Sequence, residues 1–131
     1  MQFLLPLHGL LMLLGLILII TAVFIAKKRK GNWFNTHKKF GISGLLAALF
    51  AFVSIYALKA THHYPHFKSD HGQFGLITLI SLLLIILLGI LGSKGLPWFK
   101  KIHKAAAWLI TLVMIGVAVV GLLAFLKILQ H

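Results

Sequence analysis

The sequence predicts an all-α integral membrane protein, folded as an up-down-up-down four-helix bundle. Of its 131 residues, 60% are hydrophobic and only 11% are charged, and the mean hydropathy is +1.02. A chain of this length and composition is too apolar to be a water-soluble domain. It also contains four apolar runs, each close to the roughly 20 residues that a helix needs to cross a hydrocarbon core of about 30 Å.

Helices are predicted because the backbone of a spanning segment must satisfy its own hydrogen bonds in lipid. Four strands cannot close a barrel, and an open sheet edge is not tolerated within the hydrocarbon region. We therefore expect helices over residues 3–26, 38–59, 72–93 and 103–127. Short connections between them make neighbouring helices antiparallel, in a single transmembrane domain over residues 1–131.

The first predicted helix, 3–26, is expected to be retained as a spanning helix and not cleaved as a secretory signal. No basic residue precedes its apolar stretch, and the basic segment Lys27 to Lys30 follows it. This order is the reverse of that in a signal peptide. The second, third and fourth helices each begin at or just after a histidine, and the third and fourth are separated by a connection rich in lysine.

The net charge of +12 arises from basic residues that gather in the connections. Ten of them lie in the first and third connections, and three lie on the opposite side. Because basic loops stay cytoplasmic, the first and third connections are expected in the cytoplasm of a cell (inner) membrane protein, with both termini outward or periplasmic. Membrane lipid, and not nucleic acid, is the partner expected from this pattern. The two groups are Lys27, Lys28, Arg29, Lys30, Lys38, Lys39, Lys94, Lys100, Lys101 and Lys104 on one side, and Lys59, Lys68 and Lys127 on the other.

Histidine is the only chemically versatile residue type present in quantity. The chain has no cysteine, which excludes disulfides, covalently attached c-type haem, iron–sulfur clusters and thiolate sites. Asp70 is its single acidic side chain, so sites built from paired carboxylates are excluded or weak. Eight histidines remain.

Four of these histidines stand near the start of an apolar run, about thirty residues apart: His8, a few residues inside its run, and His37, His71 and His103, at or just before theirs. Since the chain reverses between runs, His8 and His71 fall at the outward face. His37 and His103 fall at the cytoplasmic face, and each pair lies on one diagonal of a square bundle. Two histidines on opposite sides of a flat macrocycle are typical axial ligands, so the pattern predicts two b-type haems.

Small residues lie near these histidines, as a macrocycle close to a helix requires. One turn inward, on the same helix face, are Met12, Gly41, Gly75 and Ala107, three of which are small. Small residues are also common wherever membrane helices pack, so the glycines alone are better explained by packing than by a cofactor. Four histidines at equivalent depths are harder to explain in that way, because ionisable groups in spanning helices are uncommon and tend to be functional.

The segments LHGLLM (7–12), HKKFG (37–41), HGQFG (71–75) and HKAA (103–106) resemble the helix-opening histidines of the cytochrome b561 family. The resemblance covers essentially the whole chain. It implies a four-helix core that binds two b haems, with axial pairs His8 with His71 and His37 with His103. It also implies electron transfer across a membrane. The chain departs from larger members in lacking flanking helices, and Ala107 stands where a glycine is familiar.

The expected function is therefore electron transfer between an outward-side redox partner and a cytoplasmic-side or quinone partner. The donor or acceptor is either a redox protein or a quinol- or ascorbate-like molecule. Bis-histidine ligation leaves no open iron position, which favours outer-sphere transfer over oxygen chemistry. Two alternatives are a haem-free membrane scaffold or small transporter subunit, and a haem-bearing anchor of a larger redox complex. The sequence leaves open whether the chain is an oxidoreductase subunit and whether it forms a homodimer.

Two further groups have more than one interpretation. The histidines of the outward connection, His62, His63 and His66, could bind Zn²⁺ or Cu²⁺, relay protons, replace one of the ligands above, or simply be solvated. The amines of Lys38 and Lys101 could pair with haem propionates, or could serve topology and headgroup contact.

Overall fold

The computed structural model describes residues 4–63 and 68–129, and these residues form helices joined by short turns. The helices are α1 (Leu4–Lys28), α2 (Trp33–Thr61), α3 (Asp70–Ser93) and α4 (Pro97–Leu129). Each is long and apolar enough to cross a membrane. The predicted all-α, multi-pass membrane fold is confirmed, with most of the surface of each helix apolar and exposed as lipid-facing surface requires.

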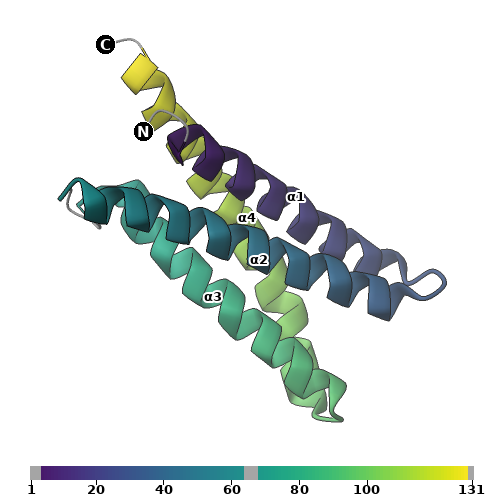
Figure 1. The fold of residues 1–131 in the computed structure, drawn as a ribbon. Coiled ribbons are helices and arrows are strands. Elements are labelled where there is room, and N and C mark those ends of the chain that lie inside the picture. Colours follow the sequence, from purple (N-terminus) through teal and green to yellow (C-terminus); the bar gives the residue numbers. More distant parts are fainter. Residues whose placement is uncertain (1–3, 64–67, 130–131) are drawn as a thin grey trace.

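The bundle is made of two antiparallel hairpins, α1 with α2 and α3 with α4, as Figure 1 shows. Both tight turns lie at one end of the bundle, and the chain termini lie toward the other (Figure 1). Contacts between the hairpins run from α1 to α4 and from α2 to α3, and they are less extensive than those within each hairpin. In the described part of the chain, the backbones of α1 and α3 stay apart, as do those of α2 and α4, with no Cα atoms within 8 Å of each other. These two pairs are therefore the diagonals of the bundle, as expected.

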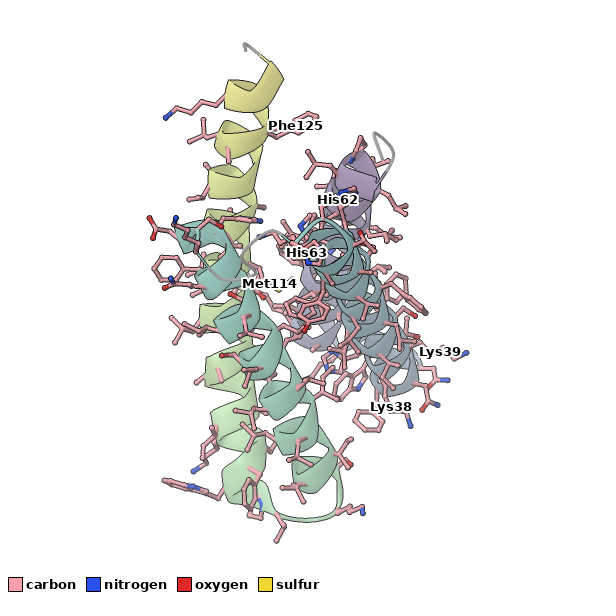
Figure 2. The ribbon with its side chains drawn as sticks, turned by 60° about the vertical axis from the view of Figure 1, so that its left-hand side comes forward. Lys38, Lys39, His62, His63, Met114 and Phe125 are labelled. Carbon is pink, nitrogen blue, oxygen red and sulfur yellow. The ribbon has the colours of Figure 1, made fainter. Side chains whose placement is uncertain are left out.

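The core lies midway along the helices, where all four meet. Its buried side chains come from every helix, and Met114 lies between the two hairpins in Figure 2. The buried cluster consists of Leu16, Ile19, Ala48, Leu82 and Met114. Two buried hydroxyls beside it, those of Thr78 and Thr111, each donate a 2.7 Å hydrogen bond to the carbonyl one turn earlier, so they add no unsatisfied group.

Helices α2 and α4 begin earlier than the apolar runs predict, at Trp33 and Pro97 instead of residues 38 and 103. Polar and basic residues are compatible with a helix, so an apolar run does not mark where the backbone becomes helical. Pro97 fits the first helical position, where its missing N–H costs nothing. Gly95, with φ of 92°, adopts the left-handed conformation that turns the chain out of α3. His37 and His103 consequently lie inside their helices.

Candidate functional site

The four helix histidines meet in two pairs, one toward each end of the bundle. The ring centroids of His8 and His71 are 6.2 Å apart and their planes are perpendicular, at 90°. The ring centroids of His37 and His103 are 6.0 Å apart, at 85°. All four side chains are half-buried. Each pair joins diagonal helices, so each site takes one histidine from each hairpin.

Three of these histidines are held by a backbone carbonyl of the neighbouring helix in the same hairpin. His8 Nδ1 hydrogen-bonds the Ala51 carbonyl at 2.9 Å, and His37 Nδ1 hydrogen-bonds the Ala22 carbonyl at 2.9 Å. His103 Nδ1 hydrogen-bonds the Ile85 carbonyl at 2.8 Å. A carbonyl oxygen only accepts, so each Nδ1 carries the proton and, in a neutral ring, Nε2 is left unprotonated. Nε2 is then the nitrogen available to a metal.

His71 is the exception among the four. Its buried Nδ1 forms no hydrogen bond of standard geometry, although the Val117 carbonyl lies against the ring. Val117 nevertheless occupies the equivalent position. In every helix the carbonyl that faces a histidine lies fourteen residues after that helix's own histidine: 8 and 22, 37 and 51, 71 and 85, 103 and 117. The two hairpins thus repeat one contact pattern, and the two levels are about 21 Å apart at 1.5 Å per residue.

Two glycines give the histidine rings their space. A Cβ on Gly121 would stand 2.6 Å from Cε1 of His71, and a Cβ on Gly89 would stand 2.9 Å from Cε1 of His103. Each glycine lies one turn beyond the carbonyl that faces the ring, so α3 and α4 clamp each other's histidine between a carbonyl and a glycine. Any larger residue at either position would displace the ring.

The glycines predicted beside a macrocycle, Gly41 and Gly75, are in open surroundings. A Cβ built on either would have no neighbour within 4 Å. These positions therefore play no part in packing between helices, which was the alternative explanation for them. Next to His71, an apolar hollow of about 290 Å³ is lined by Phe74, Val113, Gly116, Val117 and Val120.

The geometry of each pair fits two axial imidazoles on one metal ion. Two metal–nitrogen bonds of about 2 Å each, together with the distance from Nε2 to each ring centre, span about 6 Å. This length is close to the observed 6.2 and 6.0 Å between centroids. In the described residues no three His, Cys, Asp or Glu side chains gather as a metal site. A haem needs only two protein ligands, because its own ring supplies the other four.

The remaining predicted residues lie at the periphery. Lys38 and Lys101 are exposed, on α2 and α4 at the end that contains His37 and His103. Figure 2 shows Lys38 and Lys39 near one end of α2, with His62 and His63 at its other end. His66 lies outside the described residues.

A residue that sequence reasoning did not connect to the site is Trp33. Its ring centroid is 6.5 Å from that of His37, and the guanidinium of Arg29 lies 5.4 Å from the Trp33 ring centroid. This contact covers one side of the His37/His103 pair with an aromatic ring and a cation. Trp33 precedes His37 by four residues in the sequence. This spacing indicates that the two side chains are neighbours only if both lie in one helix, and α2 does begin at Trp33.

Comparisons of the chain with protein-family models, with curated proteins and with solved structures find no match.

Proposed function

We propose that the chain is a dihaem b-type cytochrome that transfers electrons across a membrane. The observation that carries the proposal is the pair of facing histidines toward each end of the bundle. Three of the four rings have Nδ1 tied to a carbonyl, which leaves Nε2 free for iron. The repeated arrangement places polar imidazoles within spanning helices, which costs free energy. A scaffold protein gains nothing from that cost.

In this proposal His8 and His71 hold one haem, and His37 and His103 hold the other. Such a haem supplies reversible one-electron chemistry without an open iron position. The carbonyls of Ala51, Ala22 and Ile85 keep the imidazoles in one orientation and one tautomer.

Other residues support the two sites. Gly41 and Gly75 leave open backbone one turn from their histidines, and the exposed amines of Lys38 and Lys101, at the end that contains His37 and His103, would pair with propionates. Between the two levels lies an apolar core built from side chains of all four helices.

The proposed orientation follows from the basic residues, ten of which flank the two turns at the end that contains His37 and His103. This end would face the cytoplasm of a cell (inner) membrane. The partners would be a redox protein or a quinol- or ascorbate-like molecule at the outward side, and a cytoplasmic or quinone partner at the other. In these features the chain would be a small member of the cytochrome b561 family.

Haem stoichiometry tests the sites directly. The purified wild-type protein should bind two non-covalent haems per chain with low-spin, six-coordinate spectra. Because the pairs are separate, His71→Ala should lose one haem and keep the other. The matched control, His63→Ala, changes an exposed histidine outside both pairs and should keep two. A haem-free protein, one haem per wild-type chain, or a five-coordinate high-spin spectrum would refute the assignment.

Electron transfer is tested in sealed liposomes with an impermeant oxidant inside and a reductant outside. The wild-type protein should pass electrons across the bilayer. His37→Ala or His103→Ala should block this crossing and leave the His8/His71 haem reducible. If liposomes with intact dihaem protein show no crossing above protein-free controls, the chain is a haem-bearing anchor and not an electron carrier.

A further inference from the structure

The Ala51 carbonyl, which accepts the hydrogen bond from His8, also accepts a second side-chain hydrogen bond. The hydroxyl of Ser54 donates to it at 2.8 Å, alongside the 2.9 Å bond from His8 Nδ1. Ser54 stands three residues after Ala51 on α2. The equivalent positions after the other three facing carbonyls are apolar: Ile25, Leu88 and Val120. A second donor of this kind is therefore particular to the His8/His71 site.

The partner ligand at this site is also less strongly hydrogen-bonded. His71 Nδ1 forms no hydrogen bond of standard geometry with the Val117 carbonyl that faces it, whereas His37 and His103 each donate to a carbonyl, at 2.9 and 2.8 Å. In the described part of the chain, those two carbonyls accept no other side-chain donor. The two sites thus share one ligand set but differ in the hydrogen bonding behind it.

This difference has a predictable effect on a bound metal. A hydrogen bond from Nδ1–H to a carbonyl raises the basicity of the opposite nitrogen, Nε2. A more basic ligand favours the more highly charged state of the metal, so it lowers the reduction potential. A carbonyl that already accepts a hydroxyl has less electron density for His8, and His71 forms no hydrogen bond of standard geometry to its facing carbonyl. Both ligands of one site are consequently the weaker donors.

We infer that Ser54 is a positioning residue that raises the reduction potential of the His8/His71 site above that of the His37/His103 site. The inference rests on the proposed dihaem function. Ser54 acts through the Ala51 carbonyl and His8 and touches no cofactor. When one electron is shared between the two sites, it resides mainly at His8/His71: that site is reduced and the other oxidised. The serine thereby gives the chain a preferred direction for internal electron movement, toward the end that contains the chain termini.

A redox titration of the full-length dihaem protein tests this inference. Two one-electron transitions are expected, and the transition that survives in His71→Ala should be the lower one. Ser54→Ala should lower the higher potential and leave the other unchanged. We expect a shift of about tenfold in the reduced-to-oxidised ratio at fixed ambient potential, which is about 59 mV for one electron. The control, Ser93→Ala, removes a similar 2.7 Å hydroxyl bond from the Ile90 carbonyl, which faces no histidine, and should shift neither potential.

A second variant introduces an equivalent hydroxyl donor at the His37/His103 site. Leu88→Ser introduces a hydroxyl three residues after Ile85, whose carbonyl accepts from His103, and should raise the lower potential. This variant keeps Ser54, so it tests the effect of the hydroxyl on the reduction potential even if Ser54→Ala loses haem. The inference is overturned if the lower transition belongs to His8/His71, or if neither variant moves its own site. Wild-type protein with fewer than two haems would instead overturn the proposed function.

Discussion

At the residue scale, the histidines are positioned mainly by backbone groups and by glycines. His71 lies against Gly121 and His103 against Gly89, both so close that a Cβ would overlap the ring. His8 and His37 are instead held by the carbonyls of Ala51 and Ala22. None of these contacts requires a charged partner, which explains how a chain with a single acidic residue can orient four imidazoles within an apolar bundle.

The prediction at this scale concerns Gly121. Gly121→Ala should displace the His71 ring, because the new Cβ would stand 2.6 Å from Cε1. Overpacking of about 1–3 kcal/mol should weaken haem binding at His8/His71 roughly 5- to 150-fold and spare the other haem. Haem titration of the apoprotein measures this effect. Gly9→Ala, where a Cβ meets nothing within 4 Å, is the control and should bind both haems normally. Equal losses in the two variants would contradict the clamp described for His71.

At the element scale, the unit of the structure is the hairpin. α1 and α2 cross at Gly15 and Gly44, where a Cβ on either glycine would stand 3.1 Å from the other's carbonyl oxygen. Such close approach is typical of small residues between membrane helices. The crossing lies midway between the two hydrogen bonds from His8 and His37, one near each end of the hairpin. A change at the crossing therefore acts on both sites together.

The prediction for the hairpin is that Gly44→Leu separates α1 from α2. A Cβ there already stands 2.9 Å from the Ile19 side chain, so a leucine cannot fit without moving the helix. We expect both haems to be lost or bound more weakly together. The free energy of unfolding should fall by about 1–3 kcal/mol or more, and the melting temperature should fall with it. Ser43→Leu is the matched control, since Ser43 lies on the exposed face at the same depth. If Gly44→Leu removed only one haem, the two sites would not share this hairpin contact.

At the scale of the whole molecule, the two hairpins depend on each other at both sites. Contacts between hairpins are fewer than those within them, yet each histidine pair takes one ligand from each hairpin. Metal bound at either pair would therefore join the hairpins. Because binding to the folded state stabilises it, the dihaem form should be the more stable one. The two ends of the bundle also differ in charge, because most of the basic residues lie at the end with both tight turns.

The corresponding prediction concerns orientation. The chain has no cysteine, so single cysteines can be introduced at Asn32, in the turn between α1 and α2, and at the exposed Lys68. An impermeant thiol reagent should label Lys68→Cys in intact cells and Asn32→Cys only after permeabilisation, because basic loops remain cytoplasmic. Labelling of both after permeabilisation shows that both thiols are accessible. The opposite pattern in intact cells would exchange the faces assigned to the two histidine pairs.

The sequence by itself determined the fold class, the number of helices long enough to span a membrane, and their antiparallel order. Each follows from a strong physical constraint. Span length is set by the hydrocarbon thickness, helices are required by backbone satisfaction in lipid, and chain reversal alternates the faces. The diagonal pairing of the helices that contain His8 and His71 also follows, because sequential short connections leave few arrangements of four helices.

Only the tertiary structure decided what lies behind each histidine. The carbonyls of Ala22, Ala51 and Ile85 have no signature in the sequence, because every residue has a carbonyl and only helix rotation selects one. These helices are apolar on nearly all faces, so periodicity does not reveal their rotation. The early start of α2 at Trp33 and the second donor from Ser54 to Ala51 likewise depend on backbone geometry and side-chain orientation. Hydropathy thus determines which segments enter the membrane, and close packing between helices determines which atoms meet there.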